Sequence, residues 1–573
     1  MNPNKFRKKI FWIVLFLTVF LFFVIFKLFN LQVINNARYA VEASVENNFD
    51  NTLQSLRGVI TASTGLILAG DRPVYDVYVD KTQVKNKKVF INTVSSVLSI
   101  PKSKLLSILN SKYIWVQLEN NVSSAQKNEL SNISSLVFEQ HEGRYYPDGS
   151  LFADILGFLS VNNGSTPVGN YGIEGYFNGA LEGHNGFTSG TESALGIPIL
   201  SSNYQFVPPK NGDTIKLTVV PALQNILSTS LDYWTKKEDA TSGTAILMDP
   251  KTGAILAMSS YPTYNPNDYW NYNNNDFANN AINFIYEPGS VGKLVTAVAA
   301  INTGKMTPST TVDDSTGVFT VGGKNIYNWN KEPDGVMNLA QILKLSSNVG
   351  ASIVATKYLS SQTLYNYSLK LGFGKLTGIM LQGEETGVIP NYQSWNESNL
   401  ATASFGQFYG VSPLQIIDAY DTVANGGKRM EPYIVQSITT PGGKTINFTP
   451  KVLDNVVSPS VASEITQMLV YATPGEPNWA LNKEGVGSYM PIIASKTGSA
   501  QVPSKKNPGQ YSNSDYVMTY VGYAPANNPQ FILLTMMNDP KKPLLNQYYA
   551  ATTACVEWGQ MAKGIFDYFN ISP

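Results

Sequence analysis

The residues of this chain that could do covalent chemistry begin with a serine and a lysine, Ser290 and Lys293. A spacing of i and i+3 places both side chains on one face of a helix, where the amine can take the hydroxyl proton. No histidine lies between Thr235 and Pro573, so a serine nucleophile there cannot use the imidazole of a Ser-His-Asp triad. The start of a helix also directs backbone N–H groups towards developing negative charge. The pair therefore predicts acyl transfer with lysine as the base.

Two further motifs follow the pair in order, Ser346-Ser347-Asn348 and Lys496-Thr497-Gly498. Each motif alone is a weak signal, because the same spacings recur elsewhere, at Ser99/Lys102, Ser124/Lys127, Ser201-Ser202-Asn203 and Lys251-Thr252-Gly253. The last of these precedes the serine and falls in a predicted hairpin turn. The order of the three motifs within one domain is specific, since it is the signature set of penicillin-binding proteins and serine β-lactamases.

The sequence around these motifs predicts strands at both ends of one domain, with helices between them. Alternating and apolar runs predict strands over residues 243–248, 254–258, 491–495, 516–524 and 530–537. An apolar-periodic segment predicts a helix over 550–569. We therefore expect one sheet assembled from the two ends of the domain. The polar stretch from Thr235 to Thr241 marks the predicted domain boundary.

The N-terminal end predicts a membrane anchor. Ile10 to Phe26 carries no charge, and Lys27 can extend the span by directing its amine to the interface. Four cations and no carboxylate precede it, which places residues 1–9 in the cytoplasm and the rest of the chain outside. The alternative is a cleaved signal peptide, whose apolar core would be about 7 to 15 residues long. Ala37-Arg38-Tyr39-Ala40 has the wrong spacing for its cleavage site.

The segments between anchor and catalytic domain predict a different kind of structure. Residues 35–56 read as a helix leaving the membrane, and two short strands flank a turn at Ser63-Thr64-Gly65. Residues 94–98 have the apolar spacing of a helix that ends before Pro101. Residues 144–217 are rich in Gly, Asn, Ser and Pro, which favours irregular β structure in an extended pedestal.

Composition excludes several classes of function. The 573 residues include 41 basic and 41 acidic ones, so the basic excess typical of a nucleic-acid-binding protein is missing and no nucleic-acid partner is expected. Hydrophobic residues make up 43% of the chain, enough to build a large core. Cys555 is the only cysteine and reads as a small core residue, while His141 and His184 are the only histidines. We therefore expect no disulfide within the chain, no zinc cluster, no metal and no cofactor.

Taken together, the motifs make the chain resemble a class B, monofunctional penicillin-binding protein over nearly its whole length. Beyond the three motifs, the resemblance rests on Arg57-Gly58, Arg144-Tyr145-Tyr146-Pro147, Gly172-Ile173-Glu174-Gly175 and Tyr286-Glu287-Pro288-Gly289. Gly372-Phe373-Gly374, Gly383-Glu384, Ser404-Phe405-Gly406-Gln407 and Gly522-Tyr523-Ala524-Pro525 resemble the division-specific branch.

This resemblance implies an α+β fold in four parts: a cytoplasmic tail (1–9), a transmembrane helix (10–31), an elongated β-rich pedestal or dimerisation domain (32–235), and a transpeptidase domain (236–573) with a mostly antiparallel sheet covered by helices. The implied activity is peptidoglycan cross-linking at the D-Ala-D-Ala ends of stem peptides on lipid-anchored strands. β-Lactams would bind covalently. A membrane glycosyltransferase and division proteins are the implied partners.

The resemblance also implies a role for each matching residue. Ser290 attacks the carbonyl between the two terminal D-alanines, and Lys293 is its base, which requires a neutral amine; burial and the nearby cation Lys496 favour that form. Ser346 relays the proton to the leaving amine, and Asn348 orients Lys293. The substrate carboxylate is held by the third motif, Lys496, Thr497, Gly498 and Ser499. The backbone N–H groups of Ser290 and Ser499 form the oxyanion hole.

Three places depart from the family pattern. In the pedestal strand pair, Ala62-Ser63-Thr64-Gly65 replaces a charged Asp-Arg-Asn-Gly, which does not touch the chemistry. Ser499 stands where a threonine is usual, which keeps the hydroxyl. Phe408 stands where a glycine usually follows Ser404-Phe405-Gly406-Gln407, so we expect a change in the local backbone or in a nearby groove.

Two alternatives stay open, a β-lactamase and a non-catalytic scaffold, while a bifunctional enzyme is not supported. A bifunctional enzyme would need a glycosyltransferase domain, of which only Glu139 to Gly143 faintly resembles a part. A membrane-anchored serine β-lactamase would need a base for deacylation, and Glu397 lies where one could be placed. A non-catalytic scaffold or binding module would keep the fold alone, and the nine-residue cytoplasmic end leaves a β-lactam sensor no signalling domain.

Overall fold

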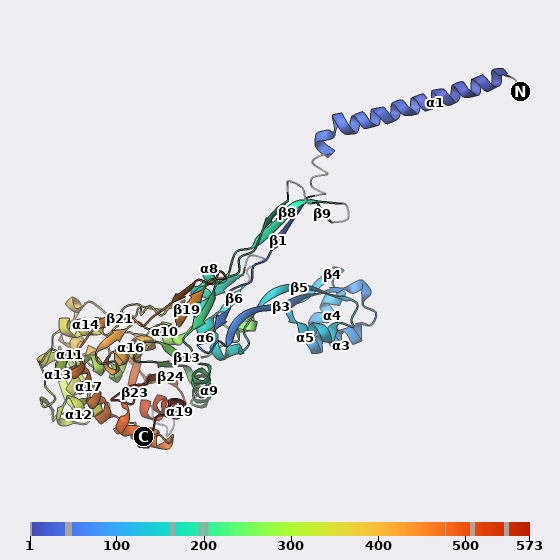
Figure 1. Cartoon of the computed structure of the whole chain (residues 1–573). Coiled ribbons are helices and arrows are strands. Elements are labelled where there is room, and N and C mark those ends of the chain that lie inside the picture. The colour runs from blue at the N-terminus through green and yellow to red at the C-terminus, as the bar shows by residue number, and fades with distance from the viewer. Residues whose placement is uncertain are drawn as a thin grey trace. The chain divides into compact units, whose positions relative to one another are not determined.

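The computed structural model describes residues 3–39, 48–160, 167–193, 197–199, 204–475, 477–504, 510–543 and 549–573. It comprises two compact units (Figure 1). The first combines Met1–Leu56 with Glu182–Gly212, and the second combines Arg57–Leu181 with Asp213–Pro573.

The first unit contains the N-terminal helix and a small sheet. Helix α1 (Pro3–Phe29) continues into a π-helical turn (Asn30–Ile34). The stretch Asn4–Ile34 is long and apolar enough to cross a membrane, and the expected span 10–31 lies inside it. The sheet is antiparallel and consists of β1 (Asn48–Leu53), β8 (Gly186–Glu192), β9 (Pro198–Ile199) and β10 (Gln205–Val207).

The helix expected over residues 35–56 is wrong at its C-terminal end. Residues 40–47 lie outside the described residues, but β1 is a strand that pairs residue by residue with β8, from Asn48 opposite Thr191 to Leu53 opposite Gly186. Its Asn, Asp and Thr residues are weak helix formers, so pairing with a distant strand decides the conformation.

A seven-stranded sheet forms the pedestal part of the second unit. Its order is β20-β19-β11-β2-β3-β4, with β5 paired to β3. The strands are β2 (Ile60–Thr61), β3 (Ile67–Asp80), β4 (Trp115–Ser123), β5 (Leu136–Tyr145), β11 (Thr214–Leu217), β19 (Val435–Thr439) and β20 (Thr445–Asn447). The two strands predicted around Ser63-Thr64-Gly65 are confirmed as β2 and β3. Because β19 and β20 come from the later half of the chain, this sheet joins segments on both sides of the predicted domain boundary.

Three helices pack against the C-terminal half of β3 and against β4 and β5. We call this part of the second unit the head. The helices are α3 (Lys87–Leu98), α4 (Lys102–Asn110) and α5 (Ser124–Leu130). Val77 and Val79 of β3 share a buried cluster with Phe90 and Val94 of α3 and Leu105 of α4. The helical spacing over residues 94–98 is confirmed, because that stretch forms the last turns of α3.

A buried ion cluster ties the pedestal together. The carboxylate of Glu174 accepts hydrogen bonds from Arg57 Nε at 2.7 Å and from Arg144 Nε at 2.6 Å. Arg144 also donates to the carbonyl of Gly58 and to Asp71. Burial alone would raise the pKa of Glu174, but Arg144 and Arg57 outweigh it and leave that pKa lowered. Three stretches that carried the resemblance therefore meet at one point.

The catalytic part of the second unit is built on a five-stranded antiparallel sheet of order β13-β12-β24-β23-β22. The strands are β12 (Ala240–Met248), β13 (Ile255–Tyr261), β22 (Ala494–Pro503), β23 (Tyr511–Ala524) and β24 (Phe531–Pro540). The two ends of the domain thus supply one sheet, as predicted. The strand expected over 491–495 starts only at Ala494 and continues through the Lys-Thr-Gly motif, because residues 487–492 form a 3-10 turn.

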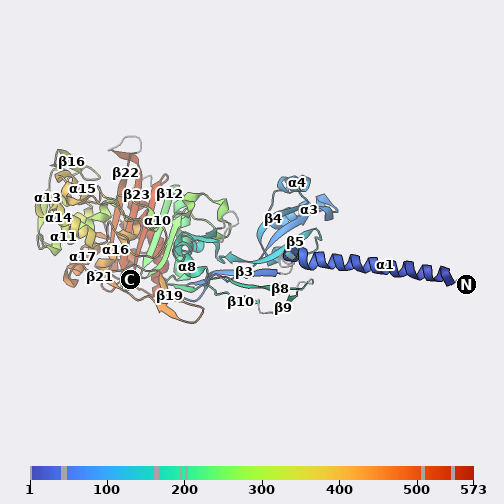
Figure 2. The same ribbon diagram turned by 90° about the horizontal axis from the view of Figure 1, so that it is seen from above.

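Helices cover both faces of this sheet (Figures 1 and 2). Helix α9 (Pro221–Lys237) and helix α19 (Ala554–Phe569) share one buried cluster with inward residues of β12, β23 and β24. Helices α11 (Lys293–Asn302), α16 (Pro413–Ala424) and α17 (Pro459–Ala472) share the other. Cys555 is fully buried in α19, as expected of a core residue. The boundary at residues 235/236 stays a prediction.

Shorter elements complete the second unit. The helices are α6 (Ala153–Leu156), α7 (Gly172–Tyr176), α8 (Asn178–Leu181), α10 (Asn280–Asn283), α12 (Leu339–Leu345), α13 (Asn348–Tyr358), α14 (Ser361–Lys370), α15 (Glu397–Ala403) and α18 (Asn478–Lys483). The strands are β6 (Phe158–Ser160), β7 (Val168–Asn170), β14 (Thr311–Asp314), β15 (Val318–Val321), β16 (Lys324–Tyr327), β17 (Gly335–Asn338), β18 (Lys428–Met430) and β21 (Val452–Asn455).

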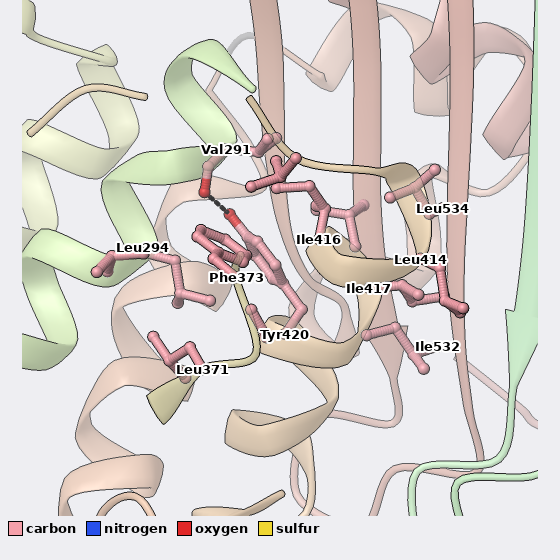
Figure 3. Packing of buried hydrophobic residues seen from close by; sticks show 14 of the residues in the cluster. Val291, Leu294, Leu371, Phe373, Leu414, Ile416, Ile417, Tyr420, Ile532 and Leu534 are labelled. Atoms are coloured by element: carbon pink, nitrogen blue, oxygen red, sulfur yellow. Dashed lines mark hydrogen bonds between the residues drawn. The ribbon is translucent and has the colours of Figure 1, made fainter. Parts of the chain in front are cut away.

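The core between α16 and the sheet also fixes the turn that carries the candidate nucleophile (Figure 3). Tyr420 of α16 is buried among apolar side chains that include Leu294 and Phe373. Its hydroxyl donates a hydrogen bond of 2.9 Å to the carbonyl of Val291, the residue after Ser290. A buried donor without a partner costs about 1 to 3 kcal/mol, so this bond holds the serine turn against the core.

We predict that Glu174→Gln destabilises the second unit by about 3 to 5 kcal/mol, because it leaves two buried guanidinium groups without their counter-charge. Chemical denaturation measures the free energy of unfolding. Glu142→Gln, an exposed carboxyl of β5, is the matched control and should change that free energy by less than about 0.5 kcal/mol. Because the Glu174 pKa is lowered, the difference in unfolding free energy between wild type and variant should shrink as the pH falls below about 4. Equal unfolding energies for both variants would contradict the role of the cluster.

A second prediction concerns the buried carboxyls Glu238 and Glu557, between α9 and α19. Burial raises the pKa of Glu238 to about 8 and that of Glu557 well above its ordinary value. A raised carboxyl pKa means that the stability it contributes is present below about pH 4 and is lost as the pH rises through 8. Glu238→Gln should therefore unfold like the wild type at pH 5 and be more stable at pH 9 by about 2 to 5 kcal/mol. A gap that does not change with pH would refute this account.

Candidate active site

Ser290 lies in a 3-10 turn, Gly289–Gly292, that leads directly into α11. Pro288 begins the turn, and Gly289 adopts a φ of +58°, in the region that favours glycine. Ser290 is half-buried and lines a cavity. We expected Ser290 in the first turn of the helix. It lies instead in a tighter 3-10 turn immediately before α11.

Lys293 meets Ser290 as the spacing predicted. Its Nζ donates to Ser290 Oγ at 2.7 Å and to Asn348 Oδ1 at 2.8 Å. The side chain is only 1% exposed, and its amine lies 5.8 Å from the centre of the Phe405 ring. An amine almost shut off from water, in contact with a hydroxyl, is arranged for proton transfer.

The second motif occupies the junction between α12 and α13. Ser346 ends α12 with a φ of +60°, and Ser347 caps α13 by accepting a hydrogen bond from the N–H of Gly350. Ser347 also donates to Asn328 Oδ1 at 3.1 Å, and Asn348 donates to the carbonyl of Tyr327 at 3.2 Å. These bonds turn Ser346 and Asn348 towards the other two motifs.

The third motif lies on β22, at the edge of the five-stranded sheet. Lys496 is 3% exposed, and its Nζ donates to Ser346 Oγ and to Thr497 Oγ1, both at 3.1 Å. Thr497, Ser499 and Gln501 line the cavity with the two-residue period of a strand. Ser499 Oγ accepts from the N–H of Ala550 at 2.9 Å. The structure therefore brings all three motifs to one place.

The cavity at this place has a volume of about 700 Å³. Besides the motif residues, its walls contain mostly aromatic and polar side chains, among them Tyr327, Trp329, Phe405, Tyr511, Tyr516 and Tyr549. Of these, only Phe405 falls in a stretch that carried the resemblance. The others come from β16 and the loop after it, from β23 and from the segment before α19, and no motif marks them in the sequence.

Phe408 adopts a backbone conformation that ordinarily favours glycine. Its φ is +77°, and its ring packs edge-on against Trp395 at 5.6 Å. The Phe408 N–H donates to Glu287, whose carboxylate also accepts from Tyr511. Phe408 thus adopts a backbone conformation that favours glycine, its ring packs beside Trp395, and the expected change in the backbone or in a nearby groove stays a prediction. Burial raises the pKa of Glu287 against these two hydrogen bonds.

The serine turn and the segment around Gly406 touch backbone to backbone. Gly406 has a φ of +84°, and a Cβ placed there would lie 1.9 Å from the carbonyl oxygen of Gly289. The Gly289 N–H donates to the carbonyl of Gly406 at 2.9 Å. Only glycine permits this approach.

Two residues that bear on the alternatives lie away from this site. Glu397 is exposed in the first turn of α15 and does not line the cavity. His141 lies on β5, where its ring bonds to Asn121. Among the described residues, no group of three or more His, Cys, Asp or Glu could hold a metal ion.

Family models match two parts of this chain. Residues 243–555 match the penicillin binding protein transpeptidase domain, and residues 52–217 match the penicillin-binding protein dimerisation domain. The chain belongs to the penicillin-binding proteins. The order of the two domains is that of the class B, monofunctional branch, as the resemblance implied.

Named relatives agree with this penicillin-binding protein assignment. The peptidoglycan D,D-transpeptidase FtsI of Buchnera aphidicola is 28% identical over 97% of this chain and 94% of its own length. The stage V sporulation protein D of Bacillus subtilis is 27% identical over 90% and 79%.

Solved structures of other penicillin-binding proteins share the fold. Penicillin binding protein 2X of Streptococcus thermophilus is 24% identical, with a TM-score of 0.70 over 91% of this chain and 80% of its own. Penicillin binding protein 3 of Mycobacterium tuberculosis, solved with aztreonam, is 22% identical, with a TM-score of 0.68 over 91% and 98%. The predicted α+β architecture is confirmed.

The Gly406 contact gives a prediction for this penicillin-binding protein. In Gly406→Ala the added methyl group would strike the carbonyl of Gly289, so we expect acylation by penicillin to slow by at least about 100-fold. Gly443→Ala is the matched control, because Gly443 has the same φ of +84° and no atom lies within 4 Å of the position that a Cβ would take there. It should cost only the backbone strain, about 1 to 2 kcal/mol of stability, and leave acylation unchanged. Equal acylation rates for the two variants would refute the role of the close contact.

Proposed function

We propose that this chain cross-links peptidoglycan by serine D,D-transpeptidation, through an acyl-enzyme on Ser290. The observation that carries the proposal is the contact of Lys293 Nζ with both Ser290 Oγ and Asn348 Oδ1, two residues that line a cavity together with Thr497 and Ser499. The named relatives that are peptidoglycan D,D-transpeptidases support it.

In the acylation step, the neutral amine of Lys293 takes the Ser290 proton as the oxygen attacks the carbonyl between the two terminal D-alanines. The backbone N–H groups of Ser290 and Ser499 donate hydrogen bonds to the carbonyl oxygen and stabilise the negative charge that develops on it. Ser499 follows the motif on an edge strand, whose N–H groups are not all used by a neighbouring strand. Removal of one such donor elsewhere costs about 3 to 4 kcal/mol of transition-state stabilisation.

The leaving group is the terminal D-alanine, whose amine needs a proton as the peptide bond breaks. Ser346, whose hydroxyl contacts Lys496 Nζ at 3.1 Å, is placed to relay it. Ser346 gives its hydroxyl proton to the amine and regains the proton that Lys293 removed from Ser290, so Lys293 is neutral again before the second half-reaction. Lys496, Thr497 and Ser499 would hold the terminal carboxylate through one cation and two hydroxyls, with Gly498 leaving room for the close contact with Val291.

In the second half-reaction, the amine of another stem peptide attacks the acyl-enzyme carbonyl. Lys293 accepts a proton from that amine and returns one to Ser290 Oγ as the ester breaks. A new peptide bond then joins the two strands, and the serine is regenerated. β-Lactams enter the same acylation step, but their ring-opened product stays attached to Ser290.

The apolar helix at Asn4–Ile34 and the likeness to FtsI-type transpeptidases indicate a membrane-anchored protein. We place residues 1–9 in the cytoplasm and the catalytic domain outside, on the positive charge of that end. The relatives named FtsI support a role in cell division. A membrane glycosyltransferase that makes the strands, together with division proteins, is the partner set that this role requires.

Covalent labelling tests the proposal. The full chain in detergent, incubated with a labelled penicillin, should acquire one long-lived adduct on Ser290, located by mass spectrometry. Ser290→Ala should remove the adduct, and Lys293→Ala should slow its formation by about 100- to 10,000-fold, as expected for loss of a general base. Ser124→Ala, from the second Ser-x-x-Lys pair, is the control and should be labelled like the wild type.

The time course separates the alternatives. Rapid release of the adduct would contradict a transpeptidase and indicate a β-lactamase. A folded sample without any adduct would contradict catalysis and leave a binding role. Incubation with a D-Ala-D-Ala stem peptide and an acceptor amine should give a cross-linked product that the Ser290→Ala variant does not form.

A further inference from the structure

The head carries a concentration of positive charge that the whole chain does not have. Residues 81–115 contain seven lysines and no Asp, Glu or Arg, although the chain as a whole is neutral. The lysines are Lys81, Lys85, Lys87, Lys88, Lys102, Lys104 and Lys112. Such a local excess creates a positive potential that attracts anions.

The fold gathers part of this segment at one end of the head. Lys87 Nζ, in the first turn of α3, donates to Asn110 Oδ1 at the end of α4, at 3.3 Å. The N–H of Lys81 donates to the carbonyl of Ile114 at 3.1 Å, just before β4. These contacts bring together a set that we call the tip surface: Lys85, Lys87, Lys88, Lys112, Tyr113, Ile114 and Trp115.

The lysines of the tip surface are exposed, and none takes part in a salt bridge between described residues. The nearest carboxylate along the chain is Asp80, which accepts hydrogen bonds from Thr82 and Gln83. Asp80 thus adds one negative charge next to seven lysines, and among the described residues it forms no salt bridge with the lysines of the tip surface.

Three large side chains lie beside these lysines in solvent. Tyr113, Ile114 and Trp115 are 62%, 61% and 51% exposed. Trp115 stacks on Tyr78 with ring centres 5.7 Å apart, and Lys112 Nζ lies 5.1 Å from the centre of the Tyr113 ring. The contact with Tyr78 holds the indole in place on the surface, so that it is presented and not folded away.

We propose that the tip surface docks on a membrane whose lipids carry anionic headgroups. Clustered lysines bind such a surface through screened attraction to its phosphates, and Tyr and Trp are enriched where lipid headgroups meet the acyl chains. A protein partner fits less well, because protein interfaces are enriched in Arg and depleted in Lys, whereas this segment has seven Lys and no Arg. The chain is itself attached to a membrane through α1, which supplies that surface.

The experiment places a probe on the head of the full chain in lipid vesicles. Leu106→Cys, on the exposed side of α4, receives a fluorescent dye, while Cys555 is fully buried and should not react. Wild-type protein treated with the dye checks that background. Vesicles contain phosphatidylcholine with a spin-labelled lipid, with or without about 30 mol % phosphatidylglycerol. Quenching of the dye reports approach of the head to the lipid surface.

We expect quenching at least about threefold stronger with phosphatidylglycerol than without it, and loss of that difference in about 0.5 M NaCl. Reversing four charges of the tip surface (K85E, K87E, K88E and K112E) should abolish the difference. The matched control reverses four exposed lysines elsewhere (K251E, K305E, K357E and K444E) and should retain it. All variants should form the penicillin adduct at the wild-type rate, which shows that they are folded.

Three outcomes would overturn the proposal. Equal quenching with and without phosphatidylglycerol would remove the role of lipid charge. Quenching that survives reversal of the tip lysines would assign the contact to another surface. No quenching in any vesicle, with normal adduct formation, would show that the head does not reach lipid and would make a protein partner the better explanation.

Discussion

The catalytic centre depends on one steric constraint, the close approach of the serine turn to two other backbones. Gly406 touches the carbonyl of Gly289 on one side, and Gly498 of β22 lies against Val291 on the other. Any side chain at these contacts would push the turn outward and separate Ser290 from the sheet edge. The polar network can then form at hydrogen-bond distance, because Lys293, Ser346 and Lys496 come from segments that the packing, and not their own attraction, has brought together.

The two buried lysines of this network donate hydrogen bonds to neutral oxygens. Hydroxyl and amide oxygens accept from them, on Ser290, Asn348, Ser346 and Thr497. A carboxylate in the place of those acceptors would stabilise the charged amine and make it a poor base, so neutral acceptors suit the proposed chemistry. In the pedestal, by contrast, a carboxylate stabilises buried cations, since Arg57 and Arg144 both form ion pairs with Glu174.

Much of this arrangement was predictable from local sequence. The Ser-x-x-Lys spacing, the hairpin at Asp249 to Gly253 and the strands at both ends of the domain depend on nearest neighbours along the chain, and the structure shows them in place. The cavity walls were not predictable, because Trp329 and Tyr549 become neighbours only through tertiary packing. Strand β1 was missed for the same reason, since its conformation is set by β8. Phe408 was noted as a departure, but only the structure shows a positive φ supported by Glu287.

The strand order of the pedestal sheet also bears on how the chain is made. Strands β19 and β20 complete that sheet beside β11, yet they are synthesised long after it, within the catalytic half of the chain. While the chain emerges from N-terminus to C-terminus, the open edge of β11 has no partner until residues 435–447 arrive. The pedestal sheet is therefore complete only after part of the catalytic half has been made, and a nascent chain stopped before residue 435 would expose an unpaired strand edge to its neighbours.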